Sequence, residues 1–152
     1  QSTTEKTFKI AADLVTYSFS LPDLYENLYS INKNIARLQG FILQNFTMSE
    51  AGVSVVKITK ETLEKYNVDA SESGQLVSVL GNIEGIVAWA FFIEEEPSLI
   101  RVRLRSKGPV INELAAKYNG GGHALAAGAK VSSWQEADAL ASELETLCQQ
   151  HK

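Results

Sequence analysis

Residues 100–105 alternate strictly between apolar and basic side chains, and this alternation constrains the fold more than any other stretch of the chain. The basic positions are Arg101, Arg103 and Arg105. Because successive side chains on a β-strand point to opposite faces, such a strand has one apolar face and one basic face. The pattern therefore predicts a strand that covers a core on one side and can bind an anion on the other.

A short helix and a glycine run follow this strand. Pro109 is expected to begin the helix and Asn119 to end it. The next residues are Gly120, Gly121, Gly122 and His123, and His123 opens a short helical segment, HALAA. Consecutive glycines are costly unless a turn needs positive φ or the backbone must approach a ligand closely. Since free N–H groups at a helix N-terminus bind phosphate or carboxylate, the turn and the strand together predict a phosphate site.

A purely structural role for the same residues stays open. Gly120 could simply follow the last turn of the helix, Gly121 and Gly122 could form a tight turn, and His123 could be a capping or surface residue.

The segment 105–129, RSKGPVINELAAKYNGGGHALAAGA, resembles the signature of the DHH-associated (DHHA1) domain of DHH-family phosphoesterases. GGGH and the following AAGA are its most specific part. The spacing of Arg105-Ser106, Asn112 and the glycines is similar to that of the nanoRNase/pAp-phosphatase branch. That branch degrades very short oligoribonucleotides and removes the 3′ phosphate from phosphoadenosine phosphate. The resemblance covers roughly residues 40–150.

This resemblance implies a substrate-binding domain rather than a complete enzyme. In the family, a preceding domain carries an Asp-His-His motif and manganese ions, and no Asp-His-His occurs in this chain. The implied substrate-binding residues are Arg105, Ser106, Asn112, Gly120, Gly121, Gly122 and His123. No catalytic residue, metal ligand or cofactor is expected in this fragment, which alone should be inactive; manganese is expected in the missing catalytic domain. Expected partners are short single-stranded RNA or nucleotide phosphates and the chain's own N-terminal DHH domain.

Two other functions remain open. A cyclic-dinucleotide phosphodiesterase of the same family would have a similar domain. A nucleic-acid-binding accessory module without coupled hydrolysis is the other, since the same domain type resembles the C-terminal part of some alanyl-tRNA synthetases. The sequence also leaves a homodimer open.

Composition narrows the class of protein. A length of 152 residues suits one domain, and a net charge of −4 means that any nucleic-acid affinity must come from a local basic patch. The single Cys148 excludes an internal disulfide, and we find no signal peptide or membrane-spanning run. These features favour a cytoplasmic protein without membrane contact. Because the chain begins at Gln1 within a helical pattern, we interpret it as a piece of a longer protein.

The N-terminal residues 1–39 are predicted to form helices that link to the missing catalytic domain. Residues 7–18 show one apolar helical stripe, and Ser20 with Pro22 should cap and begin a second helix. The alternative is that these helices pack on the same core as the rest of the chain.

The compact domain is expected over residues 40–152. Residues 41–47 and 53–59 read as two strands of a hairpin, Lys60 should begin a short helix, and residues 67–83 suggest a further helix. Ser71 or Ser73 is the expected cap of that further helix.

Residues 86–95, IVAWAFFIEE, are apolar enough for a strand buried on both faces, and they should form the central strand beside the arginine strand. Ser132 or Ser133 with Glu136 predicts the start of a final helix. The predicted fold class is therefore α/β, a mixed β-sheet flanked by helices and preceded by N-terminal linker helices.

Overall fold

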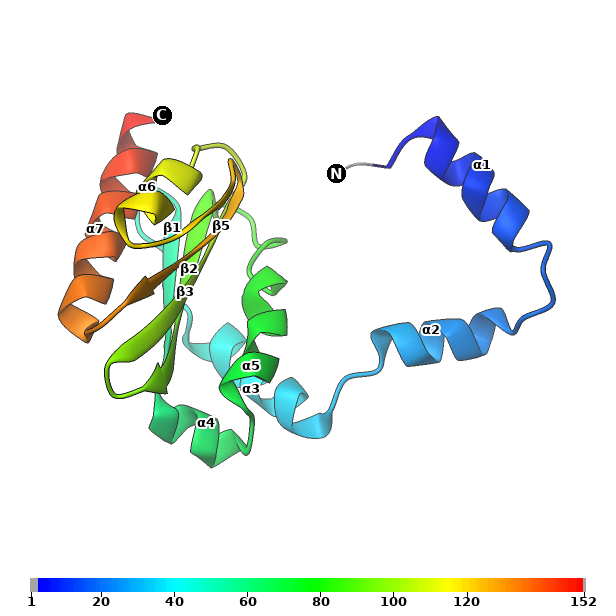
Figure 1. The fold of residues 1–152 in the computed structure, drawn as a ribbon, viewed down its shortest axis with the longest axis horizontal. Coiled ribbons are helices and arrows are strands. Elements are labelled where there is room, and N and C mark those ends of the chain that lie inside the picture. Colours follow the sequence, from blue (N-terminus) through cyan, green and yellow to red (C-terminus); the bar gives the residue numbers. More distant parts are fainter. Residues whose placement is uncertain (1–2, 152) are drawn as a thin grey trace. The chain divides into compact units, whose positions relative to one another are not determined.

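A computed structural model describes residues 3–151 of the chain (Figure 1). The elements, in order, are α1 (Glu5–Leu14), α2 (Leu21–Tyr29), α3 (Lys33–Asn45), β1 (Val53–Ile58), α4 (Lys60–Tyr66), α5 (Ala70–Ser73), the 3₁₀ helix η1 (Gly74–Ser78), β2 (Ala88–Glu96), β3 (Leu99–Ser106), α6 (Asn112–Lys117), β4 (Gly121–His123), β5 (Ala126–Val131) and α7 (Trp134–Gln150). The chain divides into two compact units, Gln1–Asn32 and Lys33–Lys152.

The first unit contains α1 and α2, and both helices were predicted. Thr4 caps α1, and the Ser20 side chain accepts the N–H of Asp23 at the start of α2, as expected for that serine. Neither helix has a buried residue. That residues 1–39 connect to another domain stays a prediction.

The second unit begins with α3, which corrects the prediction of a strand over residues 41–47. Ile35, Leu38 and Ile42 follow a helical spacing and are almost completely buried. Gly40 lies between them on the exposed side, where an added Cβ would meet nothing within 4 Å, so it does not interrupt the helix. The expected hairpin is therefore absent from the described residues, whereas the strand after it is confirmed as β1. Residues 33–39, assigned to the linker from the sequence, belong to the compact unit.

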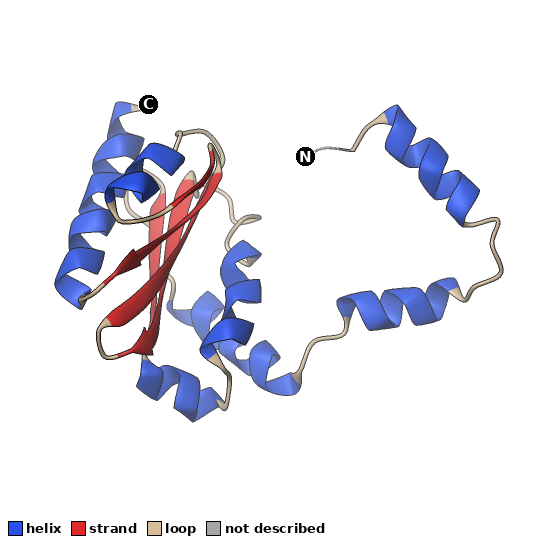
Figure 2. Cartoon of the chain, viewed as in Figure 1, coloured by secondary structure: helices blue, strands red, loops and turns tan. Residues whose placement is uncertain are grey.

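The sheet has five strands in the order β1-β2-β3-β5-β4. Figure 2 shows the strands of this sheet in red and the helices in blue. β1 and β2 are parallel, and the other neighbouring pairs are antiparallel. β2 is buried from Ala88 to Ile93 and pairs antiparallel with β3, as predicted. The middle strand, however, is β3 rather than β2, because β5 and β4 extend the sheet beyond it.

Helices cover both faces of the sheet. α6 and α7 pack over one face, on a core that includes Phe92, Val102 and Leu140. α3, α4, α5 and η1 pack over the other, around Trp89 and Phe91 (Figure 1). The mixed α/β fold class predicted from the sequence is confirmed.

Helix starts agree with the sequence at most positions. Thr59 caps α4 just before Lys60, and Ser133 caps α7 while Glu136 accepts the N–H of Ser132. The segment 67–83 forms α5 and η1 instead of one helix. Asp69 is the N-cap of α5, and Ser73, at the N-cap position of η1, forms no capping hydrogen bond with its side chain. Among residues 3–151, no helix is both long and apolar enough to cross a membrane.

Candidate functional site

Strand β3 has the two-faced character that its alternating sequence predicts. Ile100, Val102 and Leu104 are almost completely buried against α6 and α7, whereas the arginines between them are half-buried. The three arginines therefore share the opposite face of the sheet. We call this the arginine face.

Cross-strand pairing continues the arginine face over β5 and β4. Residues directly opposite each other in antiparallel strands point to the same side. Arg103 is opposite Gly128, which is opposite Gly121. Arg105 is opposite Ala126, which is opposite His123. The structure thus places Arg105 and His123, separate in sequence, in one row across three strands.

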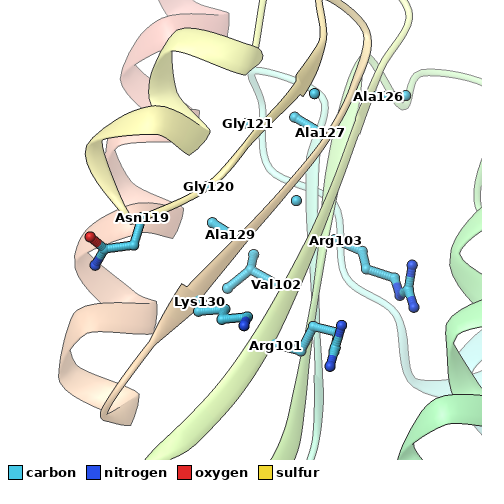
Figure 3. A pocket seen from close by; sticks show the side chains of 12 residues that line it. Arg101, Val102, Arg103, Asn119, Gly120, Gly121, Ala126, Ala127, Ala129 and Lys130 are labelled. Carbon is cyan, nitrogen blue, oxygen red and sulfur yellow. The ribbon is translucent and has the colours of Figure 1, made fainter.

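The arginine face is covered on one half and open on the other. On β2, Trp89 and Phe91 lie opposite Arg105 and Arg103 and are buried beneath the helices. Over β5 and β4, the residues in the row of Arg103 are Gly128 and Gly121, which have no side chain, whereas Lys130 lies opposite Arg101. β3, β5 and residues 119–122 line an open concavity here. Figure 3 shows Arg103 extending from the side of β3 away from α6 and α7. Arg101 and Arg103 therefore line this concavity, whereas Arg105 lies beside it, opposite Ala126.

The three arginines differ in their electrostatic partners. Arg101 donates two hydrogen bonds to Glu95, and this hydrogen bonding raises the pKa of Arg101. Within residues 3–151, no carboxylate oxygen lies within 4.0 Å of a side-chain nitrogen of Arg103 or Arg105. Burial and the positive charge of Arg103 lower the pKa of Arg105. Two neighbouring guanidinium groups without a counter-ion favour the binding of an anion.

The segment HALAA is not a helix, which corrects the sequence-based interpretation of an anion site at a helix N-terminus. β4 and β5 form a hairpin, and its turn is held by backbone hydrogen bonds from Ile111 N–H to the Ala124 carbonyl and from Ser106 N–H to the Leu125 carbonyl. These long-range bonds override the helix propensity of the alanines. The preceding helix α6 also begins at Asn112 rather than at Pro109.

The three glycines have different reasons for lacking a side chain. A Cβ on Gly120 would overlap the Gly128 carbonyl oxygen, and Gly122 has a φ of +139° that side chains rarely allow. A Cβ on Gly121, in contrast, would meet nothing within 4 Å. Gly120 and Gly122 are therefore required by the hairpin itself, while Gly121 leaves the arginine face open.

The remaining predicted site residues lie around the same corner of the domain. The Ser106 side chain is buried on the α6/α7 side of β3, where its Oγ accepts the Gly108 N–H at 3.0 Å. Asn112 follows Ile111, whose N–H binds the hairpin turn. The Oδ1 of Asn112 is buried and has no hydrogen-bond partner among residues 3–151. Ser106 thus shapes the loop beside the site rather than the arginine face.

Arg103 is the residue that sequence reasoning undervalued. The sequence shows Arg103 in the alternating run, but it does not show which arginine pairs with a glutamate. In the structure Glu95 pairs with Arg101, and Arg103 has no carboxylate partner within residues 3–151. Among residues 3–151, no group of three or more His, Cys, Asp or Glu side chains could hold a metal ion.

Comparison with known proteins relates this geometry to one family. Residues 50–150 match the DHHA1 domain. The bifunctional oligoribonuclease and PAP phosphatase NrnA of Bacillus subtilis (strain 168) is 56% identical over 151 residues, which cover 99% of this chain and 48% of that protein. A probable NrnA of Streptococcus mutans is 38% identical over 146 residues, or 96% of this chain and 47% of that protein.

A solved structure has the same fold. The crystal structure of an exopolyphosphatase-related protein from Bacteroides fragilis superposes with a TM-score of 0.82 at 25% identity, covering 97% of this chain and 46% of that one. The chain therefore spans about half the length of the curated relatives that it matches.

Proposed function

Because the chain belongs to the DHHA1 domain family, we propose that it is the substrate-binding domain of a phosphoesterase. The proposed enzyme degrades short oligoribonucleotides and dephosphorylates 3′-phosphoadenosine 5′-phosphate, the two activities in the name of the relative that is 56% identical. The observation that carries the proposal is the pair Arg103 and Arg105, which has no carboxylate partner within residues 3–151. Arg103 lines the open concavity, and Arg105 lies opposite Ala126, which also lines it.

In this proposal the arginine face holds the substrate phosphate. Arg105 forms parallel N–H bonds to phosphate oxygens, which a planar guanidinium does better than an ammonium group. Gly121 leaves the row of Arg103 free of a further side chain, and His123 donates a hydrogen bond from the end of the row of Arg105. Fixing the scissile bond in this way can lower the barrier by several kcal/mol, on the order of 7 in favourable cases.

Hydrolysis itself is assigned to the part of the enzyme outside this chain. Among residues 3–151, no group of three or more His, Cys, Asp or Glu side chains could hold a manganese ion. We propose that the DHH domain, a partner within the same polypeptide, supplies metal-activated water in the cytoplasm. Support comes from the length of the curated relatives, which is about twice that of this chain.

A direct test measures binding and turnover separately. The chain is titrated with 3′-phosphoadenosine 5′-phosphate, with a short single-stranded RNA and with a cyclic dinucleotide, and each titration is repeated with Arg105→Ala. Gly40→Ala is the control, because its methyl group would lie on the exposed side of α3. We expect saturable binding that Arg105→Ala weakens and Gly40→Ala does not. A preference for the cyclic dinucleotide would favour the phosphodiesterase alternative.

Turnover distinguishes a binding domain from an enzyme. The chain is incubated with manganese and the same RNA, and the products are followed over time. We expect none, and sustained hydrolysis would mean that a catalytic site lies within this chain. If the chain bound long structured RNA better than nucleotides, the accessory-module alternative would replace the proposal.

A further inference from the structure

Gly74, the first residue of η1, lies directly against the guanidinium of Arg103. A Cβ built on Gly74 would be 2.5 Å from Nη2 and 2.8 Å from both Cζ and Nε of Arg103. The backbone of Gly74 is ordinary right-handed helix, with φ −60° and ψ −24°, so its conformation does not require glycine. Glycine is required at residue 74 because the guanidinium of Arg103 occupies the space that a Cβ would need.

The segment that carries Gly74 is anchored to the sheet. The indole N–H of Trp89 on β2 donates to the Val77 carbonyl of η1, and Leu76 and Val77 are buried. The Oγ of Ser73, which is completely buried, donates to the Ala70 carbonyl. Gly74 is therefore a fixed surface relative to β2 and to its neighbour β3.

No polar contact within residues 3–151 determines where the Arg103 guanidinium lies. Its Nε is buried without a hydrogen-bond partner, and none of its nitrogen atoms forms an ion pair with the described residues. On one side of Arg103 is buried Phe91, and on the other is Gly128, which lines the open concavity. The shape of Gly74 therefore sets the position of this cation at the border between the covered and open halves of the arginine face.

We propose that Gly74 is a positioning residue of the phosphate site, which seats the Arg103 guanidinium beside Arg105 by leaving out a side chain. This inference rests on the proposed function of the arginine face. Gly74 does not touch the ligand and acts through Arg103 alone. A methyl group at residue 74 would displace the end of a flexible side chain rather than backbone, so the fold should survive while the cation moves.

The test is a double-mutant cycle on the 152-residue chain, with Gly74→Ala, Arg103→Ala and the combination. Each variant is titrated with 3′-phosphoadenosine 5′-phosphate, and its melting temperature is measured. Gly40→Ala is the matched glycine control. We expect Gly74→Ala to weaken binding roughly tenfold, the size of one charge-assisted contact, with little change in melting temperature. In the Arg103→Ala background, the same substitution should change affinity by less than about twofold.

The possible results separate the inference from the function on which it rests. If the parent binds and Arg105→Ala weakens it, but Gly74→Ala binds like the parent, only the role of Gly74 is wrong. If Gly74→Ala lowered the affinity equally in the parent and in the Arg103→Ala background, that role would also be wrong, because the effect of Gly74 would not depend on Arg103. If Gly74→Ala failed to fold, the variant that also lacks Arg103 should fold, since its methyl group has room; failure of both would overturn the inference. No binding by the parent would refute the proposed function first.

Discussion

Glu95 accepts two hydrogen bonds from the guanidinium of Arg101, from Nε to Oε1 at 2.6 Å and from Nη2 to Oε2 at 2.9 Å. The pairing of β2 with β3 shifts its register between Glu94 and Glu96, and this irregularity lies beside Glu95. A two-pronged pair of this kind satisfies both charges within the protein. Of the three arginines that the sequence displays equally, Arg101 is thus the one least available to a ligand.

This pairing predicts a ranking of the arginines in ligand binding. Arg105→Lys should weaken the binding of a nucleoside phosphate by about one charge-assisted hydrogen bond, ~1.5 kcal/mol or more. Arg101→Ala should have an effect within about 0.5 kcal/mol, because its charge is already matched. Calorimetric titration of both variants gives the two values. If Arg105→Lys bound as tightly as the parent while Arg101→Ala did not, the ranking would be wrong.

Releasing Arg101 from Glu95 should strengthen nucleotide binding. Glu95→Gln removes the carboxylate charge beside the arginine face, so we expect nucleotide affinity to rise by a few tenths of a kcal/mol at low salt and less at high salt. Glu96→Gln removes the same charge from an exposed residue that forms no ion pair with Arg101, and it serves as the control. Equal gains in both variants would show that only net charge matters.

Local periodicity was enough to predict the elements that build this site. The alternation in β3, the buried run of β2 and the cap of α7 are properties of short segments, and each is confirmed. The strand predicted over residues 41–47 was wrong because helix α3 continues through Gly40, where a glycine on the exposed side leaves the buried stripe intact.

Contacts between distant segments were not predictable from the sequence. The alanines of HALAA favour a helix locally, but pairing with β3 and the bond from Ile111 to Ala124 make them a hairpin. Likewise, Arg101 differs from Arg103 in its contacts with distant residues. Arg101 forms a hydrogen bond with Glu95, whereas the guanidinium of Arg103 lies against Gly74. The sequence therefore predicts the arginine strand but not which of its arginines pairs with a glutamate.

Tyr118 should make stability depend on pH in the alkaline range. Its hydroxyl donates to Glu143 Oε1 at 2.7 Å, and burial, this hydrogen bond and the charge of Glu143 raise the pKa of Tyr118 to about 12 from 10.0. Because the folded state favours the protonated phenol, the stabilisation is complete below the unfolded pKa and is lost as pH rises through about 12.

Urea unfolding of Tyr118→Phe measures this contribution. Near neutral pH, the unfolding free energy of the variant should be about 1 kcal/mol lower than that of the parent, the usual value of one hydrogen bond. Between about pH 10 and 12, the unfolding free energy of the variant should fall less with rising pH than that of the parent. Tyr17→Phe, at a residue that is 70% exposed, is the control. Parallel curves for parent and Tyr118→Phe would contradict the assignment.

The glycine run offers a separation of folding from binding. Gly122→Ala forces a side chain into a φ of +139° with the Ala126 carbonyl oxygen 2.7 Å from the new Cβ, so unfolding free energy should fall by about 1–3 kcal/mol. Gly121→Ala meets no such contact, and its methyl group points over the arginine face in the row of Arg103. It should leave the melting temperature almost unchanged and weaken nucleotide binding.

The measurements are thermal unfolding and nucleotide titration on Gly121→Ala, Gly122→Ala and His123→Ala. His123 shares a row with Arg105, and its exposed side chain is not part of the core, so His123→Ala should behave like Gly121→Ala. A ligand that approaches the concavity must pass close to residue 121, which is why even one methyl group should matter there. Suppose that Gly121→Ala and His123→Ala kept the affinity of the parent and only Gly122→Ala lost stability. The glycine run would then serve only the folding of the hairpin, and the phosphate site would consist of the arginines of β3 alone.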